Sequence, residues 1–427
     1  MKKTYNILVF PGGTEIGLEI YKSLCQCKDI RLYSAVSNVS NHASYVFNRN
    51  FVIPSIRDQT CIDSLNQIIV RHEIDYIFPA HDDIILKLVQ NANRIKARII
   101  SSPLETCLVT RSKFKTYHLF SDTLPVPQLY DNLDDIKQYP VFVKPDKSQG
   151  SQNTHIVYNK KHLSFLLEEN REYIVMEYLL GKEYTIDCFS DRDKGLLFLG
   201  GRERIRTRNG ISMNSRPVQD SVFINYANLI SEKLTLHGAW FFQLKKDKHG
   251  TYKLLEIAPR IAGTMAVHRV QGVNFALLSI YEQERIPLEI QINRSDIEID
   301  RALVNRYRHK LNYKVVYIDL DDTLIVNGTV NVNLVRFLYQ CINKGIQIVL
   351  LTKHTTRIDQ TLRKYRLSGI FNEIIQIKKS ESKSDYIHDN SAILIDDSFS
   401  ERKNVNEKLG IPTFDCSMLE MLLNERV

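Results

Sequence analysis

The chain has 427 residues, of which 43% are hydrophobic and 25% charged, and its formal net charge is +8. This length exceeds one ordinary hydrophobic core, and the composition predicts a soluble protein of about three domains. Lys and Arg are spread along the chain rather than gathered in a basic run, which favours anionic small substrates over a nucleic-acid partner. No signal peptide fits and no segment reaches transmembrane length, so we expect a cytoplasmic protein without a membrane partner. Seven irregularly spaced cysteines indicate reduced thiols rather than a disulfide framework.

The first hundred residues alternate short apolar runs with helical patterns, a rhythm that predicts βαβ units around a parallel sheet. The apolar runs are Ile7–Phe10, Ile30–Val36, Phe51–Ile53, Ile74–Phe78 and Arg98–Ile100. The first turn, Pro11 to Gly17, invites a dinucleotide interpretation, but its spacing is not G-x-G-x-x-G. The strand that follows also ends without the carboxylate that binds a ribose. A tight strand-to-helix turn is therefore favoured over an NAD site.

The stretch from Val141 to Ile156 carries the first sign of chemistry. An apolar run ends at Lys144-Pro, a loop of small and polar residues follows, and the chain turns apolar again at Ile156. This pattern predicts strand, loop, strand. Small residues let backbone N–H groups approach phosphate oxygens, and Lys144 adds a positive charge. The loop is not a Walker P-loop, because the G-x-x-x-x-G-K-[ST] pattern is missing, and alone such a loop is usually a plain hairpin.

Further motifs follow this loop in a fixed order. They are Ile174–Asp187 with Glu177, Gly181 and Glu183, then Phe242-Gln243, then Leu254-Leu-Glu256-Ile-Ala258-Pro-Arg260 with Gly263. In this order the series resembles the ATP-grasp superfamily, particularly its carbamoyl-phosphate-synthase-like carboxylate–amine ligases, over roughly two thirds of the chain. The resemblance implies a βαβ pre-ATP-grasp domain at 1–103 and an ATP-grasp domain of two α+β subdomains at 104–292. A polar linker with one helix is expected at 293–313.

The resemblance also implies roles for single residues, with ATP as cofactor and Mg²⁺, or alternatively Mn²⁺, as metal. The residues expected to bind the nucleotide are Lys113, Lys144, Ser148, Gly150, Ser151, Glu177, Leu179, Glu183 and Arg206. The metal ligands would be Gln243 and Glu256, since Mg²⁺ prefers oxygen, and Arg260 would stabilise the transferring phosphoryl group. Of Arg202, Arg204, Arg206 and Arg208, one or two should face the phosphates or the acceptor carboxylate.

Two points stay open within this resemblance. His81-Asp82-Asp83 follows a predicted strand, where it either contacts the acceptor substrate or caps the next helix. Ala258 stands where the family usually has Asn and offers no oxygen ligand. Either water or another carboxylate replaces that ligand, or the domain is a nucleotide-binding module with little turnover. Because Gln243, Glu256 and Arg260 remain, we expect activity.

A second catalytic pattern begins at Lys314, where an apolar run ends in Asp319-Leu-Asp321-Asp322-Thr323. Of two carboxylates separated by one residue, one can attack phosphorus while the other moves a proton, with Mg²⁺ beside them. Aspartates at strand ends are also ordinary helix caps. The pattern gains weight from three later features, which are Thr352 at a strand end, Lys383 before a helical pattern, and the pair Asp396-Asp397.

This order resembles the haloacid dehalogenase-like (HAD) superfamily and covers residues 314–427. The resemblance implies Asp319 as nucleophile, Asp321 as general acid/base, and Thr352 and Lys383 as ligands of the phosphoryl oxygens. The implied Mg²⁺ site comprises Asp319, Asp321, Asp396 and Asp397. Lys378 and Lys379 compete with Lys383 for the lysine role. Between Thr323 and Thr352 there is room for one helix and one strand, so we expect a capless domain, and Asp321 favours a phosphatase over a dehalogenase.

The sequence thus predicts an α/β and α+β multidomain chain with two activities. The first interpretation is an ATP-dependent carboxylate–amine ligase that forms an acyl phosphate, fused to a Mg²⁺-dependent phosphatase with an aspartyl-phosphate intermediate. In the alternative, only the phosphatase is active and the ATP-grasp half is a sensor or clamp. A non-catalytic partner in a complex is favoured least. The expected partners are a small carboxylate, an amine and a phosphorylated metabolite, and a homodimer is compatible with the sequence.

Overall fold

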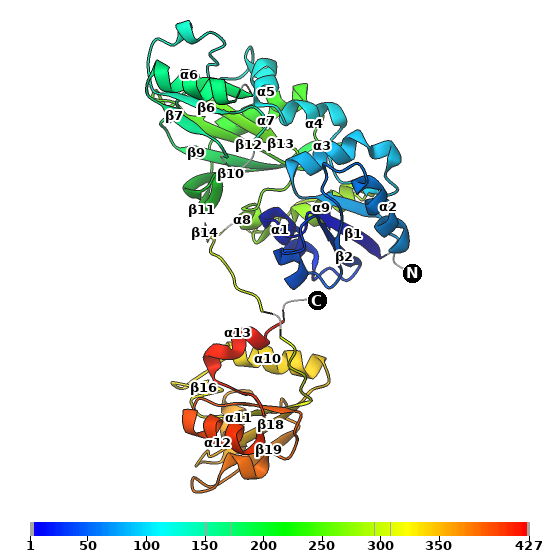
Figure 1. The fold of residues 1–427 in the computed structure, drawn as a ribbon, viewed down its shortest axis with the longest axis vertical. Helices are drawn as coiled ribbons and strands as arrows, with labels where there is room; N and C mark the ends of the chain where they lie inside the picture. Colours follow the sequence, from blue (N-terminus) through cyan, green and yellow to red (C-terminus); the bar gives the residue numbers. More distant parts are fainter. Residues whose placement is uncertain are drawn as a thin grey trace. The chain divides into compact units, whose positions relative to one another are not determined.

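The computed structural model describes residues 4–148, 150, 152–170, 172–293, 295–307 and 309–424 (Figure 1). Packing divides the chain into two compact units, which meet in sequence between Leu303 and Val304. Each unit has its own sheets and its own hydrophobic core. Ser151, one of the residues expected to bind the nucleotide, lies outside the described residues.

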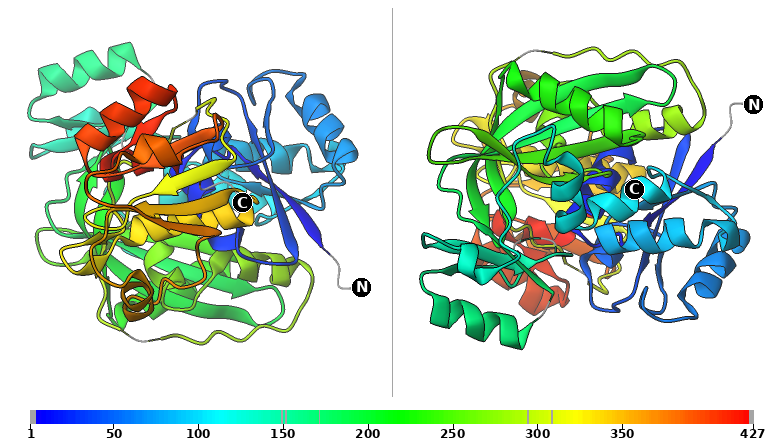
Figure 2. Two further views of the ribbon diagram at one scale, coloured as in Figure 1. Left: turned by 90° about the horizontal axis from the view of Figure 1, so that it is seen from below. Right: turned by 90° about the horizontal axis from the view of Figure 1, so that it is seen from above.

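The first unit begins with a five-stranded parallel sheet of order β3-β2-β1-β4-β5. Its elements are β1 (Tyr5–Phe10), α1 (Glu15–Leu24), β2 (Ile30–Val36), β3 (Asn50–Val52), α2 (Cys61–Arg71), β4 (Tyr76–Pro79), α3 (Asp82–Gln90) and β5 (Arg98–Ile99). Alternate residues of β1 enter two different cores, because successive side chains of a strand point to opposite faces. Helix α1 covers one face, and α2 and α3 cover the other (Figures 1 and 2). The predicted βαβ arrangement is confirmed.

A three-stranded antiparallel sheet, β7-β6-β8, follows after two helices. The elements are α4 (Leu104–Thr110), α5 (Lys113–Phe120), β6 (Val141–Pro145), β7 (His155–Val157), α6 (Lys160–Glu169) and β8 (Tyr173–Glu177). Val141 pairs with Val157, so the chain leaves β6, turns through the small-residue loop and returns alongside. The predicted strand, loop and strand are confirmed.

A six-stranded sheet of order β13-β12-β9-β10-β11-β14 completes the first unit. Its elements are β9 (Glu183–Asp191), β10 (Gly195–Arg208), β11 (Ile211–Val218), α7 (Val222–Lys233), β12 (Gly238–Lys246), β13 (Tyr252–Ala258), α8 (Ala266–Arg269), α9 (Phe275–Gln283) and β14 (Ile299–Asp300). Trp240 and Phe242 of β12 pack toward α7, whereas Phe241 joins the core that contains α1, β1 and α9. This core contains residues from both sides of position 103. The domain boundary expected at that position therefore does not separate two hydrophobic cores.

Part of the segment expected as a linker forms a strand. Strand β14 lies within it and pairs with β11 through Asn214 and Asp300. Its described residues, 293, 295–307 and 309–313, contain no helix, so the expected helix is wrong. The polar sequence of this segment has too few apolar residues to bury a helical face.

The second unit is a five-stranded parallel sheet of order β19-β18-β15-β20-β21. Its elements are β15 (Val315–Ile318), β16 (Ile325–Val326), β17 (Thr329–Val330), α10 (Val332–Asn343), β18 (Gln347–Thr352), α11 (Ile358–Lys364), β19 (Glu373–Gln376), β20 (Ala392–Ile395), α12 (Phe399–Leu409), β21 (Thr413–Phe414) and α13 (Leu419–Leu422). Between Thr323 and Thr352 the chain forms one small hairpin, β16–β17, besides the expected helix and strand.

No helix in the described part of the chain has the length and apolar character that a membrane crossing needs. The seven cysteines are all free, as their spacing predicted.

Candidate active sites

The first unit contains one large cavity of about 1190 Å³, whose wall is built from both antiparallel sheets and from the start of α1. Nearly all sequence-predicted residues of the ligase half lie on this wall. They are Lys113, Lys144, Ser148, Gly150, Glu177, Leu179, Glu183, Gln243, Glu256 and Arg260. Residues more than a hundred positions apart are therefore brought to one space.

Two lysines supply positive charge to this cavity. Lys144 ends the apolar part of β6 and is 7% exposed, and its Nζ donates a hydrogen bond of 2.9 Å to the Tyr117 hydroxyl. Burial, together with the nearby charge of Lys113, lowers the pKa of Lys144 to about 7. Lys113 is also buried and its Nζ donates to the Ser148 carbonyl at 3.0 Å. An anion bound here would stabilise both ammonium groups.

Two acidic residues of the wall, Glu177 and Glu183, have protein partners. Glu177 closes β8 and accepts a hydrogen bond of 3.0 Å from the backbone N–H of Gln128, and Lys253 lies 3.2 Å from its carboxylate. Glu183 opens β9 and forms an ion pair with Arg204. Leu179, only 4% exposed, adds an apolar surface on which a planar ring can pack.

Gln243 and Glu256 lie opposite each other on the paired strands β12 and β13. Because paired residues share one face of a sheet, both oxygen-bearing side chains point to the cavity. They fit an oxygen-preferring cation such as Mg²⁺, which keeps water in its remaining positions. Ala258, two residues beyond Glu256, is 2% exposed and packs in the core. It adds no ligand atom.

Arg260 pairs with a residue of the N-terminal sheet region. Its Nη2 lies 2.9 Å from Asp82, and Arg260 is 8% exposed. Burial acts to raise the pKa of Asp82, but Arg260 outweighs it and lowers the pKa. Within His81-Asp82-Asp83, the helix cap is His81, whose side chain accepts from the Asp83 backbone N–H, and the Asp82 carboxylate pairs with Arg260. Contact of this motif with the acceptor substrate stays a prediction. Asp83, which lies on the cavity wall, pairs with Arg111 at 2.7 Å.

The arginine-rich strand β10 places two of its four arginines on the cavity wall, Arg202 and Arg204. Arg206, expected to bind the nucleotide, is not among the residues that the structure places on this wall. Its side chain is 59% exposed and its Nη2 lies 2.8 Å from Asp300. The register of β10 against β11 shifts between Arg204 and Arg206, and such a bulge disturbs the alternation of faces. The bulge thus turns Arg206 out of the alternation that brings Arg202 and Arg204 to the cavity.

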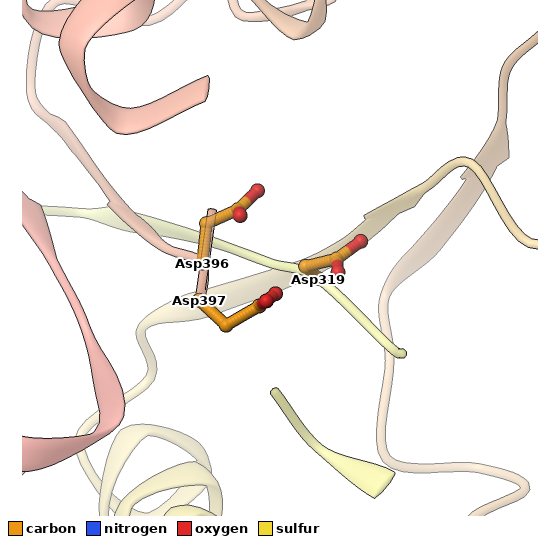
Figure 3. A group of neighbouring side chains, drawn as sticks. All are labelled: Asp319, Asp396 and Asp397. Atoms are coloured by element: carbon orange, nitrogen blue, oxygen red, sulfur yellow. The ribbon is translucent and has the colours of Figure 1, made fainter. Parts of the chain in front are cut away.

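The second unit gathers three carboxylates where two neighbouring parallel strands end (Figure 3). Asp319 follows β15, and Asp396 and Asp397 follow β20; one oxygen from each lies within 4.8 Å of the others. Lys383 is buried between them, with its Nζ 2.7 Å from Asp319 and 2.5 Å from Asp396. Burial raises the pKa of Asp319 to about 6, although Lys383 acts against this rise. The set is suited to a divalent cation beside a phosphate.

The lysine of this site is Lys383, since Lys378 and Lys379 are exposed. Thr352, fully buried at the end of β18, accepts a hydrogen bond of 3.2 Å from the His354 backbone N–H. The carboxylate of Asp321 lies outside this group of three and is 53% exposed, so the structure does not bring it to the other expected metal ligands.

Sequence reasoning missed His354, whose Nδ1 lies 2.9 Å from the Asp321 carboxylate. The other ring nitrogen lies 2.7 Å from the Thr356 hydroxyl and 3.0 Å from the Thr361 hydroxyl. The available signal was a titratable residue directly after a buried strand that ends at the same edge as Asp319. His354 fixes where the Asp321 carboxylate points.

Comparisons with known proteins agree on the first unit. A family model described as ATP-grasp in the biosynthetic pathway with Ter operon matches residues 169–300. A D-alanine–D-alanine ligase of Petrotoga mobilis is 33% identical over 100 residues, which are 22% of this chain and 34% of that protein. A carbamoyl phosphate synthase large chain of Clostridium botulinum is 23% identical over 150 residues, or 32% of this chain and 14% of that protein. The chain therefore spans about a third or less of these curated relatives.

Solved structures show the same fold. Biotin carboxylase of Campylobacter jejuni has a TM-score of 0.56 at 16% identity, covering 68% of this chain and 74% of that one. N5-carboxyaminoimidazole synthetase of Staphylococcus aureus, solved with ADP, has a TM-score of 0.56 at 17% identity, covering 69% and 81%. L-amino acid ligase of Bacillus licheniformis has a TM-score of 0.54 at 17% identity, covering 68% and 76%. The first unit has the ATP-grasp fold, and residues 169–300 within it match the ATP-grasp family model.

Proposed function

We propose that the first unit is an ATP-dependent carboxylate–amine ligase. The observation that carries this proposal is the joint placement of Lys113 and Lys144 with the oxygen pair Gln243 and Glu256 on one cavity wall. ATP and Mg²⁺ would supply the phosphoryl group and its charge neutralisation. The relatives that match in sequence or fold include ligases whose names state the joining of amino acids.

The residues of the chain divide the work of such a reaction. Lys144 and Lys113 bind phosphate oxygens, and the small-residue loop offers backbone N–H groups beside them. Gln243 and Glu256 would hold the Mg²⁺, which would neutralise phosphate charge when bound. Arg260 lines the cavity and is held in place by its ion pair with Asp82. Because Asp82 balances only part of its charge, the guanidinium can still stabilise the negative charge that develops on the transferred phosphoryl group. The carboxylate oxygen attacks the γ-phosphorus of ATP, so an acyl phosphate forms and ADP leaves; the amine then attacks the acyl carbon, phosphate leaves, and the amine nitrogen gives up a proton.

For the second unit we propose a Mg²⁺-dependent phosphatase of the HAD-like type. Asp319 is the nucleophile that forms an aspartyl phosphate, and Asp321, oriented by His354, protonates the leaving oxygen and then activates water. Thr352 and Lys383 bind phosphoryl oxygens, and Asp396 and Asp397 complete the metal site with Asp319. The carboxylate trio around a buried lysine supports this proposal. The substrate would be a phosphorylated metabolite related to those of the ligase, because hydrolysis of the acyl phosphate itself would waste ATP.

The test is ADP formation by the Asp319→Asn protein with Mg-ATP and pools of carboxylates and amines. The substitution removes background phosphate release and lies in the second unit, so the ligase half stays intact. We expect ADP only when one carboxylate and one amine are both present. ATP binding without stimulation from any pool would favour the alternative, in which the ATP-grasp half is a sensor or clamp. The buried Ala258 in place of an oxygen ligand is the observation behind that alternative.

Phosphate release by the wild-type chain from phosphorylated forms of the same substrates tests the second proposal. It should vanish in Asp319→Asn and after chelation of Mg²⁺. If the two halves act on unrelated substrate sets, the proposed sequence of reactions is wrong.

A further inference from the structure

The cavity of the first unit is larger than a nucleotide requires. Small-molecule sites usually occupy about 300–1,000 Å³, whereas this cavity measures about 1190 Å³. Part of its wall holds none of the residues assigned to ATP or Mg²⁺. That part consists of the start of α1, residues Gly263 and Thr264, Arg202, and Arg301 beyond β14. It is the natural place for a second ligand.

Arg202 is almost completely buried in this wall, at 1% exposure. Its Nε and Nη2 donate to Asp187 at 2.8 and 3.1 Å, while Nη1 is buried without a hydrogen-bond partner among the described residues. Asp187 also lies 3.6 Å from His268, whose pKa is lowered chiefly by burial, so the imidazole is neutral near pH 7. The Asp187 carboxylate thus neutralises the charge of Arg202 and of no second cation. The Nη1 group of Arg202 has no hydrogen-bond acceptor among the described residues.

Arg301 brings a second guanidinium to the same wall. Its Nη1 lies 3.5 Å from the Ser212 carbonyl, and the described residues place no carboxylate within ion-pair distance of it. Burial lowers the pKa of Arg301, as does the like charge of Arg202, although Glu15 and Glu19 act in the opposite direction. A desolvated cation without an ion-pair partner is unfavourable alone and is stabilised by a bound anion.

The sheet register fixes how far this wall lies from the metal ligands. Arg202 pairs with Thr185, Thr185 with Gln243, and Gln243 with Glu256, so the four residues form one row across β10, β9, β12 and β13. All four line the cavity. With neighbouring strands about 4.8 Å apart, the Arg202 backbone lies about 10 Å from Gln243. A ligand group bound at Arg202 and Arg301 would therefore lie several bonds away from the substrate atom that reacts beside Gln243 and Glu256.

We propose that Arg301 and Arg202 form an anion subsite that binds a second acid group of the carboxylate substrate. The substrate class is then a carboxylic acid with a carboxylate or phosphate monoester at its far end. Guanidinium groups suit both, because their planar N–H donors match two oxygens of either anion. This inference rests on the proposed ligase function and narrows its substrate. A phosphate ester at this position would also be a substrate class for the second unit.

The experiment is isothermal titration calorimetry of the full chain with and without Mg-ADP. The ligands are dicarboxylates from succinate to suberate, monocarboxylates of equal length, and phosphate esters of the corresponding ω-hydroxy acids. We expect one diacid or phosphorylated acid to bind at least about tenfold more tightly than its monocarboxylate, because its second acid group accepts charge-assisted hydrogen bonds that the monocarboxylate lacks. Dicarboxylates and phosphate esters compared at equal length identify the second acid group.

Variants locate the effect. Arg301→Gln should abolish the tenfold preference, whereas the matched control Arg206→Gln, an exposed arginine of the same sheet that does not line the cavity, should keep it. Gly263→Ala is an independent variant that keeps every charge. A Cβ there would lie 3.1 Å from Arg301 Nη1, so the guanidinium must shift by a few tenths of an ångström and the preference should weaken.

Each outcome decides a different claim. Equal binding of diacids and monoacids, or a preference that survives Arg301→Gln in a protein with unchanged circular dichroism, overturns the subsite. Failure of ADP to bind overturns the ligase proposal instead, and the titrations without ADP still report on the subsite. If neither ADP nor any acid binds, both proposals fall.

Discussion

Replacing Lys144 with methionine tests the electrostatics of the nucleotide site most directly. In the free protein, burial beside Lys113 lowers the pKa of Lys144 to about 7, so about nine tenths of the molecules carry a neutral amine at pH 8. A bound triphosphate supplies the missing counter-charge and returns the pKa toward its usual value of about 10.4. Binding of ATP at pH 8 should therefore take up about 0.9 proton, and at pH 6 it should take up about 0.1 through this group.

Calorimetry of ATP binding at pH 8 in two buffers with different ionisation enthalpies measures that uptake. Lys144→Met should lose it and should bind ATP about 10- to 100-fold more weakly, because a charge-assisted hydrogen bond to phosphate is removed. The matched control is Lys160→Met, an exposed lysine paired with Asp134, which should behave as wild type. Zero proton uptake by the wild type at pH 8, with normal ATP affinity, would refute the reasoning.

The same pKa predicts how stability depends on pH. Below about pH 7 the folded protein holds a charged Lys144 that burial disfavours, and the unfolded chain binds more protons between pH 7 and about 10.4. Stability of the free protein due to this group thus rises with pH across that window. Lys144→Met removes the penalty, which is on the order of 5 kcal/mol as an upper limit, so it should raise the unfolding temperature at pH 6 more than at pH 10.

Three further substitutions probe the other charges. Lys383→Met leaves buried carboxylates without their cation and should destabilise the second unit by about 3–5 kcal/mol, measured by urea unfolding against the exposed control Lys378→Met; equal midpoints would contradict the buried ion pairs. Glu256→Gln should weaken Mg²⁺-dependent nucleotide binding while leaving metal-free binding nearly unchanged, a difference that titration in EDTA exposes. His354→Asn keeps a donor near Asp321 and should retain more phosphatase kcat than His354→Leu at similar KM; identical losses would remove its orienting role.

The sequence was most informative where a local pattern and a long-range pattern agreed. The resemblance to the HAD superfamily implied that Asp319 lies beside Asp396 and Asp397, and the parallel strands β15 and β20 do bring these three carboxylates to one edge of the sheet. Patterning could not separate Lys383 from its neighbours Lys378 and Lys379, because the choice depends on how the segment after β19 closes onto the sheet.

Pairings across long sequence distances were beyond such reasoning. Arg260 pairs with Asp82, which lies 178 positions earlier. The sequence around neither residue indicates this pairing. The sequence also gives no sign of the register shift after Arg204. A bulge needs no characteristic residue when the extra position lies at the sheet surface. The resemblance implied Arg206 as a ligand, and the bulge that turns its side chain away from the cavity could not be foreseen.

The two units should survive separation. The hydrophobic cores of the first unit draw on residues up to Leu288, and those of the second on residues from Val315 onward. Leu303 and Val304 between them are 89% and 58% exposed, which suits an engineered protease site. After cleavage we expect unchanged ATP binding and unchanged hydrolysis of small phosphate esters, because each site lies within one core. A loss of either activity, with both fragments folded by circular dichroism, would show that one unit completes the site of the other. If instead only the coupled conversion of a shared substrate slows, the fusion serves the transfer of that substrate between two independent sites.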